Sequence, residues 1–100
     1  MPAFVVAQLK FTDVAAYRRY QSAFPAVFAR FDAQLLAADE AAVVLEGDWP
    51  MDKIVIIAFP DHAEATRFVS DAEYQAISRD RLAGATTVSL LVSGFAPASR

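Results

Sequence analysis

The chain has 100 residues, a formal net charge of -3 and a sequence pI ≈ 4.9, so it is long enough for one domain and too short for two ordinary ones. This charge excludes the basic surface that captures nucleic-acid backbones, and the absence of Cys excludes disulfides and thiolate chemistry. No apolar run reaches the length of a membrane span, and the N-terminal residues lack the pattern of a signal peptide. We therefore expect a single cytoplasmic domain over residues 1–100, with neither nucleic acid nor a membrane as partner.

The first predicted elements are a strand and a long amphipathic helix. A strand over residues 3–11 is predicted by the β-rich run AFVVAQLKF, and Thr12 or Asp13 can cap a helix directly after it. Large apolar residues then recur at three- and four-residue steps and define one helical face: Tyr17, Tyr20, Phe24, Val27, Phe28 and Phe31. Pro25 lacks an amide hydrogen, so it predicts a kink in this helix or its division into two.

The middle of the chain predicts two strands joined by a tight turn. Residues 43–46 read VVLE and have the composition of a strand end, while residues 53–60 read KIVIIAFP and give the strongest strand signal in the chain. Between them, residues 46–50 read EGDWP and contain a Gly and a Pro, which favour a turn. We interpret Gly47 to Pro50 as the turn between the second and third strands.

Two short helices and a final strand are predicted next. Asp61 with Glu64 resembles a capping box, and so does Ser70 with Glu73. These pairs indicate helices over about residues 61–69 and 71–82. Gly84 ends the helical region, and the run TTVSLLVSGF predicts the last strand over residues 86–95.

The order β-α-β-β-α-β predicts an α+β fold of the ferredoxin-like type, with a four-stranded antiparallel sheet and two helical regions on one face. The strand over residues 54–59 is apolar on both faces, and apolar residues make up 56% of the chain against ~45–50% in ordinary soluble domains. We therefore expect the helix-free face to be buried against a second subunit in a homodimer. A cavity at this interface would receive polar groups from Gln8, Lys10, Thr87, Ser89 and Ser93.

Several segments carry a resemblance to a known family. They are LEGDWP at residues 45–50, IVIIAFPDHAEATRF at 54–68 and EYQAI at 73–77, preceded by a D-x-x-A-Y-x-x-Y pattern that begins at Asp13. Over nearly its whole length the chain resembles the family labelled domain of unknown function 1330, within the dimeric α/β-barrel superfamily. The resemblance implies a ferredoxin-like subunit that pairs sheet to sheet, and it implies no particular reaction.

Two stretches depart from the family pattern. Members commonly carry G-G-R after the first helix and R-G-G some residues later, where residues 32–34 and 38–40 of this chain read D-A-Q and A-D-E. The chain therefore lacks both of those arginines. The family's Arg late in the second helical region matches Arg81.

Three residues are candidate catalytic groups: Glu46, Tyr20 and Arg81. Glu46 can be a cavity carboxylate held ionised by Arg81, or a hairpin-end acid paired with a surface cation. Tyr20 belongs to the apolar helix face and has a polar tip that can reach a pocket. Arg81 can hold an anionic group of a ligand, or it can belong to a solvated helix face.

Four residues are candidate ligand contacts: Trp49, Gln8, Lys10 and Ser89. Trp49 can cover the cavity mouth, stack on a ligand or pack on the partner subunit. With one His and no Cys, the chain offers no transition-metal site, and it contains no Gly-rich phosphate loop. We therefore expect neither a metal nor a cofactor.

Two functions remain open. One is a non-catalytic homodimer that binds a small apolar or aromatic molecule in a cavity between the sheet and the partner subunit. The alternative is a metal-independent enzyme acting on a small aromatic or acyl substrate, because the superfamily that the chain resembles includes monooxygenases, isomerases and decarboxylating enzymes. The sequence shows no nucleophile–base pair, which favours the binding function.

Overall fold

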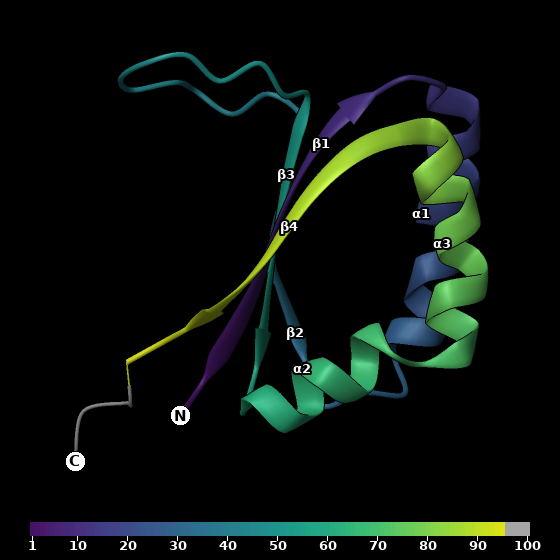
Figure 1. Ribbon diagram of the computed structural model, residues 1–100, viewed down its shortest axis with the longest axis vertical. Coiled ribbons are helices and arrows are strands. Elements are labelled where there is room, and N and C mark those ends of the chain that lie inside the picture. Colours follow the sequence, from purple (N-terminus) through teal and green to yellow (C-terminus); the bar gives the residue numbers. More distant parts are fainter. Residues whose placement is uncertain (96–100) are drawn as a thin grey trace.

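The computed structural model describes residues 1–95. In chain order its elements are β1 (Ala3–Phe11), α1 (Val14–Phe28), β2 (Gln34–Asp39), β3 (Lys53–Phe59), α2 (His62–Val69), α3 (Ala72–Gly84) and β4 (Ala85–Ser93). The strands form one antiparallel sheet in the order β2-β3-β1-β4, and the helices lie on one side of it (Figure 1). The predicted β-α-β-β-α-β order and the four-stranded α+β architecture are confirmed.

Strand pairing decides which side chains face the helices. β1 lies between β3 and β4, and its register places Val5 opposite Ile57 on one side and Leu91 on the other. Val5 and Ile57 belong to the core beneath the helices, so Phe4 and Val6, their strand neighbours, point to the opposite face. That helix-free face is mainly apolar and carries Phe4, Val6, Ile54, Ile56, Ala58, Val88, Leu90 and Val92.

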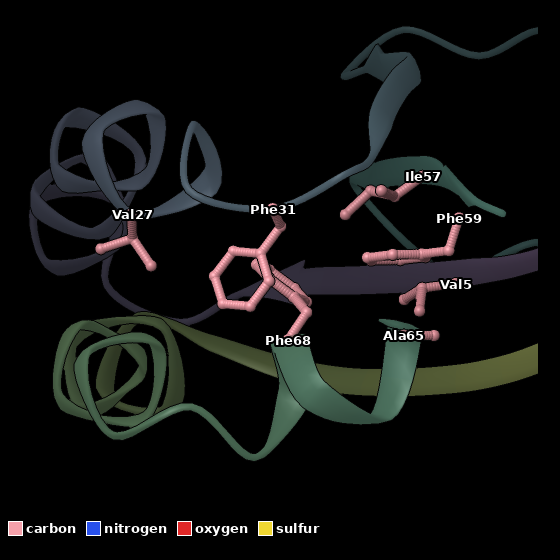
Figure 2. Close-up of a cluster of buried hydrophobic side chains, with 7 residues drawn as sticks. All are labelled: Val5, Val27, Phe31, Ile57, Phe59, Ala65 and Phe68. Carbon is pink, nitrogen blue, oxygen red and sulfur yellow. The ribbon is translucent and has the colours of Figure 1, made fainter. Parts of the chain in front are cut away.

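Phe68 of α2 is central to the core between the helices and the sheet (Figure 2). Its side chain is 1% exposed, and its ring centroid lies 5.2 Å from that of Phe31 and 5.6 Å from that of Phe59. Val5 and Ile57 complete the cluster from the sheet. Burying one Phe side chain contributes roughly 1.5–3 kcal/mol, so this cluster fixes α2 and the end of α1 against the strands.

Side-chain caps begin each helix. The Asp13 carboxylate accepts from the Ala16 backbone N–H, and the Asp61 carboxylate accepts from the Glu64 N–H, as the sequence predicted. The predicted cap at Ser70 is wrong. Asp71 caps α3 instead, while the Ser70 backbone closes α2. Asp71 follows Ser70 directly and has an extended backbone, as N-cap residues usually do. Its carboxylate can therefore accept a hydrogen bond from the Tyr74 backbone N–H.

Pro25 does not divide α1, which runs without a break from Val14 to Phe28. The proline lies in the last turn, so the helix loses the one backbone bond that its missing N–H would have made. The Pro25 carbonyl still accepts from the Ala29 N–H at 3.0 Å. Among the described residues, none of the helices combines the length and the apolar character that crossing a bilayer requires.

The second strand lies earlier than the sequence predicted. β2 ends at Asp39, and the VVLE run at residues 43–46 belongs to the long connection over residues 40–52. This connection extends away from the sheet (Figure 1), and Val43 and Leu45 are 82% and 95% exposed. Gly47 takes a positive φ of 84°, which only Gly adopts at little cost, so the turn that we expected at EGDWP is one part of a longer loop.

Candidate functional site

A cavity of ≈ 530 Å³ lies between the sheet and the helices. Its floor is made by sheet residues Val5, Ala7, Leu9, Val55 and Ile57, and its other walls include Tyr17, Tyr20, Phe24, Phe68 and Tyr74. The sequence led us to expect a cavity on the helix-free face, whereas this one lies on the helix-covered face of the same subunit. The residues that surround it are mostly aliphatic or aromatic, so its body suits an apolar molecule.

The space exists because α1 and α3 pack closely on each other instead of lying flat on the sheet. The backbone N–H groups of Thr12 and Asp13 both donate to the Gly84 carbonyl, at 2.9 and 3.1 Å. A Cβ atom at Gly84 would overlap the backbone nitrogen of Tyr17, so a Gly at this position allows the two helices to approach. Figure 1 shows α1 and α3 side by side, standing apart from the strands.

Two tyrosine hydroxyls meet on the helix side of the cavity. The Oη atoms of Tyr20 and Tyr74 lie 3.3 Å apart, and Tyr20 is only 8% exposed. Burial raises the pKa of the Tyr20 hydroxyl, so this group stays protonated and can donate a hydrogen bond at neutral pH. The Arg81 Cζ atom lies 5.8 Å from the centroid of the Tyr20 ring, within the range of a cation–π contact.

Arg81 and Thr87 bring unpartnered polar atoms to the same cavity. The Nε atom of Arg81 and the Oγ1 atom of Thr87 are buried and have no hydrogen-bond partner within residues 1–95. Thr87 pairs with Leu9 and Ser89 pairs with Ala7 across the β1–β4 ladder, so both hydroxyl side chains share the cavity face of the sheet. Buried polar groups in folded proteins are almost always satisfied, so two unpartnered polar atoms among the lining residues of one cavity are unusual.

A third polar group is the buried cation of Lys53 on β3. Lys53 is 3% exposed, and its Nζ atom lies 3.3 Å from Glu40 Oε2 and 4.8 Å from the centroid of the Tyr17 ring. Glu40 also accepts two hydrogen bonds from Arg18, at 2.6 and 2.7 Å. Hydrogen bonding to Arg18, followed by that to Lys53, lowers the pKa of the Glu40 carboxyl to about 2. One carboxylate therefore serves two cations, and the cluster keeps a net positive charge.

The cavity brings together three of the predicted site residues. Tyr20, Arg81 and Ser89 line it, and their predicted roles stay predictions. Glu46 does not line the cavity: it lies in the exposed connection over residues 40–52, not at the end of a strand as we expected. Within residues 1–95 its carboxylate makes no ion pair, because the connection carries it away from the sheet.

The remaining candidates lie outside the cavity. The Trp49 indole Nε1 donates to Gln8 Oε1 at 2.8 Å, and Gln8 is on the helix-free face because its neighbour Leu9 faces the helices. Lys10 is exposed, with its Nζ atom 4.0 Å from Asp52 Oδ2. Asp52 in turn accepts from the Phe11 backbone N–H at 2.8 Å, so these contacts attach the end of the long connection to β1.

Sequence reasoning missed Lys53 and Tyr74 as cavity residues. The alternation of side chains along a strand could have identified Lys53, because it places Lys53 on the same face of β3 as Val55 and Ile57. Lys53 also pairs with the buried Leu9 of β1. Tyr74 gave no comparable signal, because its hydroxyl becomes relevant only when α3 packs beside α1. In the part of the chain that the structure describes, no three His, Asp or Glu side chains come together as metal ligands.

The sequence matches one family model, described as Domain of unknown function (DUF1330), over residues 2–95. The chain belongs to this family. The resemblance that the LEGDWP and IVIIAFPDHAEATRF segments carry is thereby confirmed. No curated protein matches the DUF1330 chain significantly.

Solved structures with the same fold resemble this DUF1330 protein. A protein of unknown function from Rhodopseudomonas palustris has a TM-score of 0.78 and 17% identity, over 96% of this chain and 84% of that one. SnoaB, a cofactor-independent oxygenase from Streptomyces nogalater, has a TM-score of 0.68 and 17% identity, over 96% and 95%. A dimeric protein of unknown function with a ferredoxin-like fold, from Bacteroides fragilis, has a TM-score of 0.65 and 9% identity, over 93% and 96%. The ferredoxin-like fold is therefore confirmed, and at these identities the likeness concerns the fold alone.

Proposed function

We propose that this protein binds a small, mainly apolar organic molecule in the cavity between its sheet and its helices, and that it does so as a homodimer. The observation that carries the proposal is the cavity itself. Its volume of ≈ 530 Å³ falls within the ~300–1,000 Å³ range of ligand pockets. Its apolar walls with a few convergent polar groups are the usual composition of a small-molecule site.

A neutral aromatic probe tests the binding function. We expect 1-naphthamide to bind with a stoichiometry of one per chain in isothermal titration calorimetry. Replacing Val55 on the cavity floor with Phe should abolish binding, because the larger ring fills the space. Ala63→Phe, on the exposed side of α2, is the matched control and should bind as the wild type does. If Val55→Phe is folded by thermal denaturation and binds the probe as tightly as the wild type, the probe binds outside the cavity.

The homodimer is supported by the helix-free face. Val88, Leu90 and Val92 of β4 are 45%, 51% and 42% exposed on it, and Ile54 and Ile56 continue the apolar surface on β3. A contiguous apolar face of a sheet is uncommon on a monomer and is typical of a protein–protein interface. The Bacteroides fragilis neighbour is described as dimeric, which supports the same assembly.

Analytical ultracentrifugation tests the assembly. We expect a species of twice the 10.9 kDa chain mass at micromolar concentration. Leu90→Glu should shift it toward the monomer by placing a charge in the interface. Leu82→Glu, on the exposed surface of α3, is the control and should leave the mass unchanged. A wild-type monomer at this concentration would contradict the interpretation of the helix-free face.

The alternative function is a metal-independent enzyme that uses the same cavity. The specific observation in its favour is the Tyr20–Tyr74 hydroxyl pair, in which Tyr20 remains protonated and can donate to a substrate oxygen. The description of SnoaB as a cofactor-independent oxygenase adds analogy at the level of the fold. Oxygen uptake with naphthalenediols should then be protein-dependent and should fall in Tyr20→Phe. Uptake that Tyr20→Phe leaves unchanged would remove Tyr20 from this role.

A further inference from the structure

We infer that the cavity selects a ligand with a carboxylate group, which the Arg81 guanidinium and the Thr87 hydroxyl bind together. The inference rests on the proposed function, since it assigns a ligand class to the same cavity. Within residues 1–95, the buried Nε atom of Arg81 and the buried Oγ1 atom of Thr87 have no hydrogen-bond partner. A carboxylate supplies acceptors for both, because each of its oxygens can receive an N–H or an O–H donor.

The charged residues that line the cavity favour an anionic ligand. Lys53 and Arg81 are cations that line it, and none of the described lining residues is an acid. Glu40, the carboxylate partner of Lys53, lies outside the lining and also accepts two hydrogen bonds from Arg18. An anion would therefore meet a positive potential inside a mostly apolar site, where charges are screened less than in water.

Arg81 also differs from most arginines on the protein surface. Four of them are paired with a carboxylate at 2.6–3.2 Å: Arg18, Arg19, Arg30 and Arg67. Arg81 makes no ion pair and no hydrogen bond within residues 1–95, although its Nε atom is inaccessible to solvent. A guanidinium with a planar row of donors and no acceptor matches the geometry of a carboxylate.

The apolar walls define the rest of the ligand. Phe24, Phe68 and Tyr74 present aromatic rings from the helices, and Val55 and Ile57 present aliphatic groups from β3. A flat aromatic body fits between such walls, while its carboxylate projects toward Arg81 and Thr87. The predicted ligand class is therefore an aromatic monocarboxylate of one or two rings.

Calorimetry with 1-naphthoate and 1-naphthamide tests the inference, because the two probes have nearly the same shape and differ in charge at pH 7. We expect the wild type to bind 1-naphthoate about tenfold or more tightly, as the loss of a charge-assisted hydrogen bond implies. Arg81→Met should remove this preference and retain 1-naphthamide binding. Arg79→Met, an exposed position on the same helix, should keep the preference.

Thr87→Val gives a second test that keeps the side-chain volume. It should reduce 1-naphthoate affinity more than 1-naphthamide affinity. Equal affinities of the wild type for both probes, or a preference that persists in Arg81→Met, would overturn the carboxylate inference and leave the binding function standing. If neither probe binds the wild type, both proposals fail.

Discussion

Replacing Glu40 with Gln removes the only negative charge of the cluster beside Lys53 and Arg18. Gln keeps the size of the side chain and can still accept a hydrogen bond from Arg18. The buried Lys53, which is 3% exposed, would then lack a counter-ion within residues 1–95. Removing one partner of a buried pair is destabilising because the other charge stays out of water without compensation.

The size of the effect follows from the pKa of the Glu40 carboxyl, which lies at about 2 in the folded protein against an ordinary value of 4.5. Each pKa unit corresponds to about 1.4 kcal/mol, so the full difference corresponds to about 3.5 kcal/mol. The Glu40 side chain is 34% exposed, and solvent screening reduces the value. We expect Glu40→Gln to lower the free energy of unfolding by about 1–2 kcal/mol at pH 7.

Urea denaturation at a fixed protein concentration, followed by circular dichroism, measures this loss. Because the folded pKa is depressed, the contribution of Glu40 is fully present above pH 4.5 and is lost as the pH falls toward about 2. The difference in the free energy of unfolding between wild type and Glu40→Gln should therefore decrease over that pH range. Glu46→Gln, in the exposed loop, is the matched control and should change stability by less than about 0.5 kcal/mol. No gap at pH 7, or a gap that stays constant with pH, would refute the electrostatic reasoning.

Three further substitutions test the packing and the helix caps. Gly84→Ala should destabilise by about 1–3 kcal/mol in thermal denaturation, because the new methyl group would overlap the Tyr17 backbone; a raised Tm would contradict this. Phe68→Ala should lower the free energy of unfolding by about 3–5 kcal/mol in urea denaturation, because it leaves a cavity at the centre of the aromatic core. A loss below about 1 kcal/mol would show that the neighbouring side chains fill this cavity. Asp71→Ala should lower the free energy of unfolding by about 0.5–2 kcal/mol in the same measurement, and by more than Ser70→Ala does. A larger loss in Ser70→Ala would show that Ser70 caps α3.

The fold could be predicted because its signals are local. The β-rich runs at residues 3–11 and 53–59 form the two central strands, and Asp13 and Asp61 cap helices where the sequence places them. The second strand was missed because apolar content alone does not distinguish a covered strand from an exposed loop. Val43 and Leu45 look like strand residues, yet nothing within residues 1–95 covers them.

The candidate site was only partly predictable, because its position depends on how far the helices stand from the sheet. Tyr20 could be named from its place on the apolar stripe of α1, and Arg81 from the family pattern. The sequence could not predict on which side of the sheet the cavity forms, because this depends on the close approach of α1 and α3 at Gly84. The role of Lys53 was missed for a related reason: its ion-pair partner Glu40 lies 13 residues earlier, at the start of the long connection.

The hydrogen bond between Trp49 and Gln8 has a practical consequence for spectroscopy. Trp49 is the only Trp in the chain, and its indole is held on the opposite face of the sheet from the cavity. The fluorescence emission of Trp49 should therefore change when another molecule covers the helix-free face, and it should not change when a ligand occupies the cavity. A ligand screen based on Trp quenching would therefore miss ligands of the proposed cavity site, whereas the emission maximum should report on dissociation of the proposed dimer.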